Sequence, residues 1–362
     1  MGSSVSYNLA SRGLRVLTLE RFGLNHEFGS SHGRTRIIRL AYFEDPRYVP
    51  LLRRAFVSWD ELAERSGTEV IRRLGGLMVG REEGRLVSGV LRSARMHSLP
   101  HKRMSAREVM EQFSALRLEE DHCAVYEENA GALFPDRCIS SFVRAARESG
   151  CEFHFAERVT RWKPHPESVE VKTEKDTYEA DKLVFSAGAW MGSLLPGLLP
   201  LTCERQVQFW FESPKDGTFS GERMPVFIVE EDSSHYFYGI PDVGHGVKVA
   251  RTHGGTPVDP ETMERSVTDA DLAPVRDFAQ RRMPRLSASP IASMPCIYSN
   301  TPDMNFVVDF HPQDERVLLI SACSGHGFKF SSVMGEVAAE MVTEGRSEFD
   351  ISFLRIGRFS EK

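Results

Sequence analysis

A glycine-rich turn near the C-terminus contains the first residues whose types and spacing could do chemistry. An apolar run at residues 317–320 has the pattern of a strand buried on both faces, and it leads into Ser-Gly-His-Gly at residues 324–327. Residues 331–342 follow with apolar positions at helical spacing. Backbone N–H groups in such a turn, together with the helix dipole, can hold an anionic group. Lys329 lies at the mouth of the turn. Taken alone, the pattern favours a tight turn beside a solvated lysine.

A second stretch, residues 29–39, combines glycines and small residues with Arg34, Arg36 and Arg39. Its backbone could contact a pyrophosphate, and its guanidinium groups could bind carboxylates through paired hydrogen bonds. A solvated basic loop is an equally good interpretation of this stretch by itself. A nucleic-acid site is disfavoured, because no aromatic residues that could stack on bases alternate with the arginines.

The N-terminal residues have the pattern of half a dinucleotide-binding unit. Residues 2–12 predict a helix, and residues 14–20 predict a strand that ends in Glu20. In a complete βαβ unit this acid binds a ribose hydroxyl, and a strand with a G-x-G-x-x-G turn precedes the helix. Gly2 could only be the last of those glycines. We therefore expect the central strand of the unit to lie upstream of Met1.

Helix and strand patterns along the rest of the chain indicate what positions these residues. Amphipathic helices are predicted at residues 46–67, 138–148 and 269–283, and residues 105–108 form a capping box that begins another helix. Residues 182–190 have the pattern of a buried strand that ends in small residues, where a cofactor could approach the backbone.

Residues 205–251 read as β-strands without intervening helices, which predicts a separate sheet. We predict an α/β protein with a discontinuous Rossmann-like domain that binds the cofactor and an α+β substrate domain with an antiparallel or mixed sheet. The predicted cofactor-binding domain comprises residues 1–45, 136–204 and 295–362, and the substrate domain comprises residues 46–135 and 205–294.

Composition and charge exclude several classes of protein. The chain has 362 residues, enough for two domains, and a net charge of −6, which gives no general affinity for nucleic acid. No apolar run reaches the roughly 20 residues that span a bilayer, and neither a secretory signal nor a Ser-Lys-Leu-type C-terminus is expected. The six cysteines form no CxxC pairs, so we expect no zinc or other metal site and no disulfides. The expected location is the cytoplasm, or the peroxisome if a targeting signal lies outside the given sequence.

Four motifs occur together in one order along the chain. They are Ser-Ser-His-Gly-Arg-Thr-Arg-Ile-Ile-Arg at residues 30–39, Ser-Ala-Gly-Ala-Trp at 186–190, Met-Pro-Cys-Ile-Tyr-Ser-Asn-Thr-Pro-Asp at 294–303 and Ser-Gly-His-Gly-Phe-Lys-Phe at 324–330. With this set, essentially the whole chain resembles the flavin amine oxidases of the monomeric sarcosine oxidase family. That family includes N-methyltryptophan oxidase and the peroxisomal sarcosine/L-pipecolate oxidases. The resemblance implies an FAD-binding domain and a monomer.

The resemblance also implies a covalent thioether between the flavin 8α-methyl group and Cys296. From the residues alone, Cys296 would be a small buried core side chain. Glu20 matches the acid that binds the adenosine ribose, and the residues from Ser324 to Phe328 would line the flavin ring, with the helix N-terminus after them stabilising negative charge on the reduced ring. The further positions that the resemblance assigns to cofactor binding are Gly2, His32, Gly33, Thr35, Arg36, Val159, Gly188, Trp190, Gly325, His326, Gly327 and Lys329.

For the substrate, the resemblance implies that Arg39 and Lys329 clamp an amino-acid carboxylate, one through a bidentate fork and the other as a point charge. Tyr238 and Tyr298 match aromatic residues that line the substrate pocket. Lys248 matches the lysine that activates oxygen, where a cation would stabilise developing superoxide. Without the resemblance, an outward strand lysine is the simpler interpretation of Lys248.

The implied reaction is the oxidation of a secondary amino acid such as sarcosine or L-pipecolate. A hydride passes from the carbon beside nitrogen to flavin N5, the resulting imine hydrolyses, and O2 is reduced to H2O2. The partners are therefore a small amino acid and O2.

The chain departs from the family pattern at two places. Thr252 occupies the position of a histidine that helps to set substrate preference, and it is flanked by Arg251 and His253. Because of Arg251, we expect that an acidic or bulkier amino acid could be accepted. The second departure is the lack of the first strand and the leading glycines, which leaves an alternative: a truncated, non-catalytic remnant or isoform unable to bind FAD. An NAD-dependent dehydrogenase is excluded, because Cys296 and the Ser-Gly-His-Gly turn would have no role in it.

Overall fold

The computed structural model describes residues 1–321 and 324–359, and its largest feature is a mixed β-sheet. The strands run in the order β17-β13-β16-β15-β14-β4-β6-β5, and β18 pairs with β13. Their bounds are β4 (Gly76–Gly80), β5 (Lys102–Ser105), β6 (Cys123–Glu127), β13 (Thr202–Phe211), β14 (Val226–Glu230), β15 (Tyr236–Ile240), β16 (Val247–Thr252), β17 (Thr256–Pro257) and β18 (Pro290–Asn300). Strands β14 and β4 are parallel, whereas the other neighbours are antiparallel. The two segments assigned to the substrate domain thus contribute to one mixed sheet.

The register of this sheet decides which side chains face the cavity described below. Trp210 of β13 pairs with Lys248 of β16, and Gln206 pairs with Cys296 of β18. Paired residues point to the same side of a sheet, and so do residues two or four positions apart on one strand. Four residues predicted to act in the site therefore share this side: Tyr238, Lys248, Cys296 and Tyr298.

The opposite side of the sheet packs against α7 (Asp269–Arg282) and forms a separate apolar core. Phe209, Phe211 and Phe237 are buried there, and the ring of Phe237 stacks on that of Phe278 with centroids 4.3 Å apart. Burial of these aromatic side chains on one side of the sheet fixes its register, because a shift by one residue would turn them toward the cavity.

Smaller sheets surround the cavity. β1 (Leu17–Leu19) pairs in parallel with β8 (Glu152–His154), and β12 (Leu183–Phe185) pairs in parallel with β20 (Asp314–Ser321). Strand β19 (Val307–His311) adds to β20 in the antiparallel sense. In these small sheets of the described residues, the parallel strands thus form two separate pairs, β1–β8 and β12–β20. The remaining strands are β2 (Arg36–Ile38), β3 (Ile71–Arg73) and β7 (Gly131–Leu133) in one sheet, and β9 (Val159–Pro164), β10 (Val169–Thr173) and β11 (Thr177–Ala180) in another.

Two of the strand predictions need correction. The apolar run at residues 317–320 is fully buried in β20, as predicted. The predicted buried strand at residues 182–190 is β12 alone, and its Leu183 and Val184 are half-buried, because β12 pairs with β20 on one side while its other side borders the cavity. The strand predicted at residues 14–20 is likewise reduced to β1.

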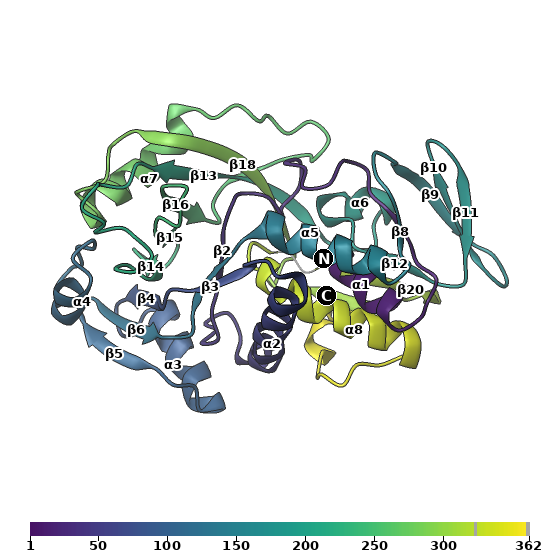
Figure 1. Ribbon diagram of the computed structural model, residues 1–362, viewed down its shortest axis with the longest axis horizontal. Helices are drawn as coiled ribbons and strands as arrows, with labels where there is room; N and C mark the ends of the chain where they lie inside the picture. Colours follow the sequence, from purple (N-terminus) through teal and green to yellow (C-terminus); the bar gives the residue numbers. More distant parts are fainter. Residues whose placement is uncertain (322–323, 360–362) are drawn as a thin grey trace.

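Long helices pack beside the small sheets and confirm the helical predictions (Figure 1). Their bounds are α1 (Gly2–Ser11), α2 (Val49–Ser66), α5 (Pro135–Glu148) and α8 (Ser331–Glu344). The close approach of α1 to α8 requires Gly335, because a Cβ atom there would contact the backbone of Ser4. The shorter helices are η1 (Pro46–Tyr48), α3 (Arg85–His97), α4 (Ala106–Gln112), η2 (Gly188–Trp190), α6 (Met191–Leu194), η3 (Phe328–Phe330), η4 (Ser352–Leu354) and η5 (Ile356–Phe359). The predicted capping box of Ser105 and Glu108 starts α4.

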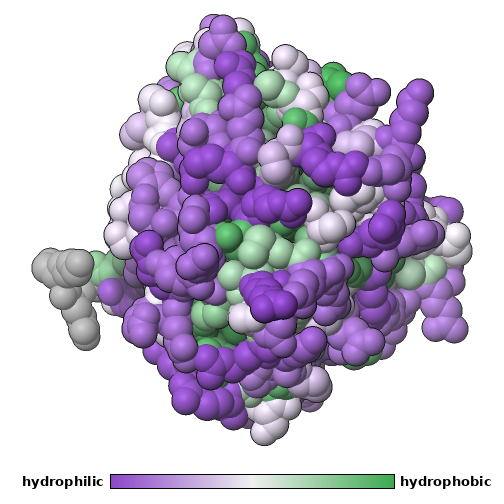
Figure 2. Space-filling model, turned by 90° about the vertical axis from the view of Figure 1, so that its left-hand side faces the viewer, coloured by the Kyte–Doolittle hydropathy of each residue, from purple (hydrophilic) through white to green (hydrophobic). Residues whose placement is uncertain are grey.

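The arrangement places the large sheet and α7 on one side of the molecule, and α1, α8 and the small sheets on the other (Figure 1). Strand β18 pairs with β13 without interruption through residue 300, across the predicted boundary at residue 295. The domain boundaries themselves stay a prediction. Hydrophilic residues surround a small apolar area on the face seen in Figure 2. Among residues 1–321 and 324–359, none of the helices has the length and apolar character that crossing a bilayer requires.

Candidate active site

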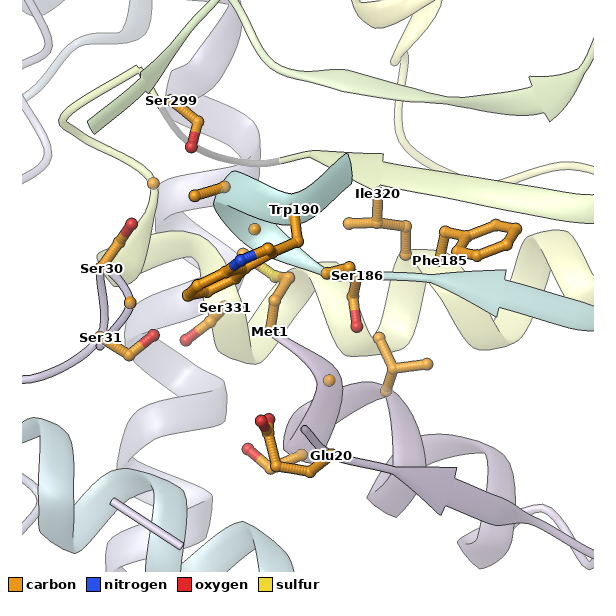
Figure 3. Close-up of a pocket in the computed structure, with 18 of the residues that line it drawn as sticks. Met1, Glu20, Ser30, Ser31, Phe185, Ser186, Trp190, Ser299, Ile320 and Ser331 are labelled. Carbon is orange, nitrogen blue, oxygen red and sulfur yellow. The ribbon is translucent and has the colours of Figure 1, made fainter. Parts of the chain in front are cut away.

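A cavity of about 2260 Å³ is lined by the Cys296 side of the large sheet, the small parallel sheets and the N-terminal ends of α1 and α8. Ligand pockets usually have volumes of about 300–1,000 Å³, so this cavity can hold a ligand of dinucleotide size together with a small substrate. Figure 3 shows Met1, Trp190 and Ser331 converging in one part of it, with Glu20 at one side. Segments that are far apart in the sequence thus meet around one space.

One end of the cavity is built around the start of α1. Met1, Gly2 and Ser3 line the wall, and no side chain caps the first turn of the helix, so its N–H groups can bind an anionic group. A Cβ atom on Gly2 would lie 3.0 Å from the Ser186 Oγ, which explains the glycine. Glu20 follows β1, accepts a hydrogen bond of 2.9 Å from the Phe22 N–H, and has a pKa raised by burial.

The loop at residues 29–36 forms a neighbouring part of the wall through Ser30, Ser31 and Arg36. Arg36 donates hydrogen bonds to the Ser30 carbonyl at 2.9 Å and to Gln208 Oε1 at 3.1 Å, which hold the loop against β13. Gly33 has φ +105°, and a Cβ atom there would meet the side chains of Gln208 and Arg36. Glycine is therefore required at this position.

Two residues of this loop that were predicted to bind the cofactor, His32 and Thr35, have buried polar side chains. The Nε2 of His32 and the hydroxyl of Thr35 have no hydrogen-bond partner among the described residues. Burial, followed by the charge of Arg36, lowers the pKa of His32 to about 3, so its ring is neutral at physiological pH. A neutral imidazole and a hydroxyl can each donate to or accept from a polar ligand.

Cys296 lies on β18 and lines the cavity. The residue is 3% exposed, and burial raises the pKa of its thiol, although Arg36 and Lys248 act in the opposite direction. Burial outweighs these charges, so the side chain is a neutral thiol at the cavity wall, within reach of a bound ligand.

Lys248 is 1% exposed and lies directly behind the cavity wall. Its Nζ donates to the carbonyl oxygens of Gly33 at 3.1 Å and Thr35 at 2.8 Å, and it lies 5.8 Å from the ring centroid of Tyr238. Burial, followed by the charge of Arg36, lowers its pKa well below the ordinary value for lysine. The amine therefore sits in a site that favours its neutral form until a negative charge is placed beside it.

At another part of the cavity Arg39, Lys329 and Glu44 form a buried charged cluster. The Nη2 of Arg39 donates to both carboxylate oxygens of Glu44 at 2.8 Å, and Nη1 donates to the Ala41 carbonyl at 2.8 Å. Burial, and then the charge of Arg39, lower the pKa of Lys329 to about 7, although Glu44 acts in the opposite direction. Burial opposes ionisation of Glu44, but Arg39, His326 and Lys329 together hold its pKa below the usual value. Two cations thus share one carboxylate.

His326 of the glycine-rich turn helps to hold this cluster. Its Nε2 lies 2.9 Å from the Met304 carbonyl and must donate to it, so Nδ1 accepts the hydrogen bond of 2.6 Å from the Tyr42 hydroxyl. Burial lowers the pKa of His326 to about 4, which keeps the ring neutral. Lys329 donates to the His326 carbonyl at 2.8 Å, so the turn and the lysine are fixed together.

Aromatic and histidine side chains complete the wall near these charges. Tyr238 and Tyr298 both line the cavity, and burial raises the pKa of Tyr238 to about 12. Although Thr252 replaces the expected histidine, the next residue, His253, lines the cavity and lies 5.5 Å from the Tyr298 ring between centroids. The role predicted for Arg251 is wrong, because its side chain donates to the Gly254 carbonyl and is not part of the cavity wall formed by the described residues.

The cavity brings together most of the residues predicted from the sequence. Those on its wall are Gly2, Glu20, Arg36, Arg39, Val159, Gly188, Trp190, Tyr238, Cys296, Tyr298, Gly325, His326, Gly327, Phe328 and Lys329. Those that lie behind the wall are His32, Gly33, Thr35, Lys248 and Ser324. Cys323, within the turn segment, lies outside the described residues.

Sequence reasoning missed Glu44, Gln208, His253 and Arg85, all of which line the cavity. The signal for Glu44 was available, because it follows Arg39 by five residues and an acid so close can serve as a counterion. The other three come into the site through sheet pairing and the packing of α3, which local sequence patterns do not reveal.

Comparison with known proteins gives a consistent result. The family of FAD dependent oxidoreductases matches residues 1–341. A monomeric sarcosine oxidase from Streptomyces avermitilis is 40% identical over 358 residues, covering 97% of this chain and 93% of that protein. An N-methyl-L-tryptophan oxidase from Yersinia pestis is 33% identical over 362 residues, covering 99% of this chain and 96% of that protein. The solved structure of NikD, an unusual amino acid oxidase essential for nikkomycin biosynthesis, shares the fold with a TM-score of 0.85 at 22% identity, covering 98% of this chain and 94% of that one.

The chain therefore belongs to the family of FAD dependent oxidoreductases, and it is an FAD-dependent amine oxidase of the sarcosine oxidase type. The residues of the cavity fit FAD. The uncapped N-terminus of α1 suits a pyrophosphate, and Glu20 suits a ribose. The unpartnered polar atoms of His32 and Thr35 belong to the loop at residues 29–36, which lines a neighbouring part of the cavity. Neither the site nor the relatives support the alternative of a non-catalytic remnant.

Proposed function

We propose that this chain oxidises a secondary amino acid, either N-methylated like sarcosine or cyclic like L-pipecolate, with O2 as the electron acceptor. The observation that supports this most is the position of Arg39 and Lys329 on one cavity wall that also carries Cys296, Tyr238 and Tyr298. The names of the two sequence relatives, a sarcosine oxidase and an N-methyl-L-tryptophan oxidase, point to N-methylated amino acids. A monomer that acts in the cytoplasm or peroxisome remains a prediction.

In this proposal the substrate carboxylate binds Arg39 and Lys329. The guanidinium of Arg39 already holds the carboxylate of Glu44 through its Nη2, so its geometry suits a second carboxylate. Its Nε is buried without a hydrogen-bond partner among the residues described, which leaves one donor for the substrate. Fixing the carboxylate in this way orients the amine and the carbon beside it.

The aromatic wall of Tyr238, Tyr298 and His253 then keeps water from the reacting carbon and presents few charges to the amine. FAD, when bound, would supply the redox chemistry: a hydride leaves the carbon beside nitrogen and a proton leaves the amine, giving an imine that water hydrolyses, and O2 takes up the two electrons and two protons as hydrogen peroxide. Lys248 is the group that stabilises the reaction with oxygen, because its buried amine, which burial keeps in the neutral form, gains most from holding a proton when negative charge develops beside it.

We further propose a thioether between Cys296 Sγ and the flavin 8α-methyl carbon, whose formation would replace the thiol S–H bond and one methyl C–H bond and would leave two electrons on the flavin for O2 to remove. Support comes from the buried thiol on the cavity wall and from the charge of Arg36, which acts against the rise in the thiol pKa that burial causes.

Acid precipitation of the purified holoenzyme tests the covalent link. Yellow flavin should stay in the denatured pellet of the wild-type protein and should move to the supernatant of Cys296→Ala, while Cys138→Ala, a change at a buried core cysteine, should keep its flavin in the pellet. Flavin released from the wild-type pellet would contradict the thioether. Peroxide formation from sarcosine, N-methyl-L-tryptophan and L-pipecolate tests the reaction itself. No peroxide from any secondary amino acid, by a flavin-loaded protein, would overturn the proposed function.

A further inference from the structure

The substrate part of the cavity contains a cation that the proposed carboxylate clamp does not use. Arg85, the first residue of α3, lines the cavity. Within residues 1–321 and 324–359, its guanidinium makes no ion pair and no side-chain hydrogen bond. The guanidinium carbon lies 5.9 Å from the ring centroid of Phe43. Most arginines elsewhere in the structure pair with a carboxylate or a carbonyl, so this one has binding capacity to spare.

Phe43 connects this free arginine to the carboxylate clamp. The guanidinium carbon of Arg39 lies 5.0 Å from the same ring centroid, so the two cations flank one aromatic ring. The ring of Phe43 also stacks on that of Tyr236, with centroids 5.8 Å apart. Phe43, Arg85 and Tyr236 lie outside the motifs predicted to contact FAD. An apolar surface therefore runs from one cation to the other.

The backbone at Arg85 is held in place by buried hydrogen bonds. The carboxylate of Glu230 accepts from the N–H of Arg85 at 3.1 Å and from the N–H of Leu86 at 2.9 Å, and it also accepts from the Tyr236 hydroxyl at 2.9 Å. Glu230 thus neutralises the start of α3 and connects it to the residue that stacks on Phe43. The backbone of Arg85 is consequently fixed relative to the aromatic surface, while its side chain is exposed and lines the cavity.

A second polar group points to a ligand in the same region. His253 lines the cavity, and its Nδ1 is buried without a hydrogen-bond partner in the described part of the chain. Burial lowers the pKa of His253, and the charge of Arg85 is close enough to lower it further, while Glu204 and Glu44 act in the opposite direction. The ring is therefore neutral at physiological pH and can donate one hydrogen bond.

We infer that the cavity accepts a secondary amino acid whose side chain ends in a second carboxylate, with Arg85 binding that group. This inference rests on the proposed function. The α-carboxylate lies at Arg39 and Lys329, the methylene groups lie on the ring of Phe43, and the side-chain carboxylate reaches Arg85. N-methyl-L-glutamate and N-methyl-L-aspartate have this chemistry: two anionic groups separated by a short apolar chain. The acceptance of an acidic amino acid, which was expected because of Arg251, is thus assigned to Arg85 instead.

The test compares two substrates of nearly equal shape, N-methyl-L-glutamate and N-methyl-L-glutamine, on the purified holoenzyme. We expect the wild-type kcat/KM for the acidic substrate to exceed that for the amide by about tenfold, as a hydrogen-bonded charge pair provides. Arg85→Met should remove this difference, chiefly through a higher KM for N-methyl-L-glutamate, and should change the kcat/KM for N-methyl-L-glutamine, which has no second charge, much less.

Arg92→Met is the matched control, because Arg92 lies on the same helix and is exposed but does not line the described cavity. It removes the same charge and should leave the substrate ratio unchanged. Equal kcat/KM values for the acid and the amide in the wild type, or an equal loss for both substrates in Arg85→Met, would overturn the inference. Failure to oxidise sarcosine and both N-methyl substrates would instead count against the proposed function, so the two failures are distinguishable.

Discussion

Two pairs of basic side chains differ in the negative charge near them. Arg39 is ion-paired with Glu44, and the charge of Glu44 also acts on Lys329, which donates to the His326 carbonyl. Arg36 and Lys248 instead donate to backbone carbonyls and to the amide oxygen of Gln208. Neither Arg36 nor Lys248 has a carboxylate within ion-pair distance in the part of the chain that the structure describes. Burial lowers the pKa of both lysines, to about 7 for Lys329 and well below the usual value for Lys248, and the charge of Glu44 acts against burial at Lys329.

This contrast teaches what each pair can bind. A cation that already has a carboxylate partner can exchange it for, or share it with, the carboxylate of a substrate, because the geometry for that group is already formed. A cation held by neutral groups gains most when negative charge develops next to it, because burial makes its charged form costly until then. The first pair suits ground-state binding and the second suits a charge that exists only during the reaction.

The substitution Lys248→Met tests the role assigned to the second pair most directly. We expect anaerobic flavin reduction by sarcosine to remain nearly unchanged and flavin reoxidation by O2 to slow by about 100- to 1,000-fold, the effect of removing one preorganised electrostatic contact. Stopped-flow absorbance measures the two half-reactions separately. Lys248→Arg, which keeps the positive charge, should recover part of the rate. Equal losses in both half-reactions would show that Lys248 supports the structure rather than the oxygen step.

A somewhat smaller effect is expected for Arg39→Ala. Removal of one partner of a buried charge pair costs about 2–5 kcal/mol, so the KM for sarcosine should rise at least about 30-fold. Flavin content, measured by absorbance per protein, should stay the same. The double variant Arg39→Ala with Glu44→Gln serves as the control, because it removes the carboxylate left without its arginine. Unchanged substrate binding in the single variant would contradict the carboxylate clamp.

The smallest effect concerns the pH dependence of Lys329. With a pKa lowered to about 7, Lys329 is a cation below pH 7 and loses its charge as the pH rises through 7. Binding of methoxyacetate, which has the carboxylate of sarcosine but no titrating amine, should therefore weaken above pH 7, by at most about tenfold per pH unit. Titration of the flavin absorbance measures this dissociation constant.

The matched variant is Lys329→Arg, since a guanidinium keeps its charge across this pH range. Its affinity for methoxyacetate should stay level between pH 6 and 9, a range spanning about one unit below the pKa of Lys329 to about two above it. The same pH dependence in the wild type and in Lys329→Arg would assign the titration to another group.

Much of the fold followed from local patterns. The long helices were predicted within a few residues, because their apolar spacing and end signals lie within each segment. The buried strand at residues 317–320 and the turn after it were also evident. The strands at residues 14–20 and 182–190 were predicted too long, because a strand's length depends on its partner, and β1 and β12 are short in their pairings with β8 and β20.

The site was predicted less completely, and for a physical reason. Cys296 and Tyr298 were identified from the ordered motifs and Lys248 from the family resemblance, and the sheet register shows why they share one side. Arg251 was given a role that the structure does not support, because it lies on β16 opposite Phe237, and strand alternation therefore directs its side chain away from the cavity side. His253, just after the strand, has φ +60° and lines the cavity.

The sequence by itself determined the family, the class of reaction and the types of charge available, because these are carried by residue identities in a fixed order. The tertiary structure alone decided which charges are paired. Glu44 neutralises Arg39, Arg85 stays without a counterion beside Phe43, and Lys248 is held by carbonyls. The reason is that pairing depends on distance in space and on exclusion of water, and even the near neighbours Arg39 and Glu44 are shielded from water only when segments distant in the chain pack around them.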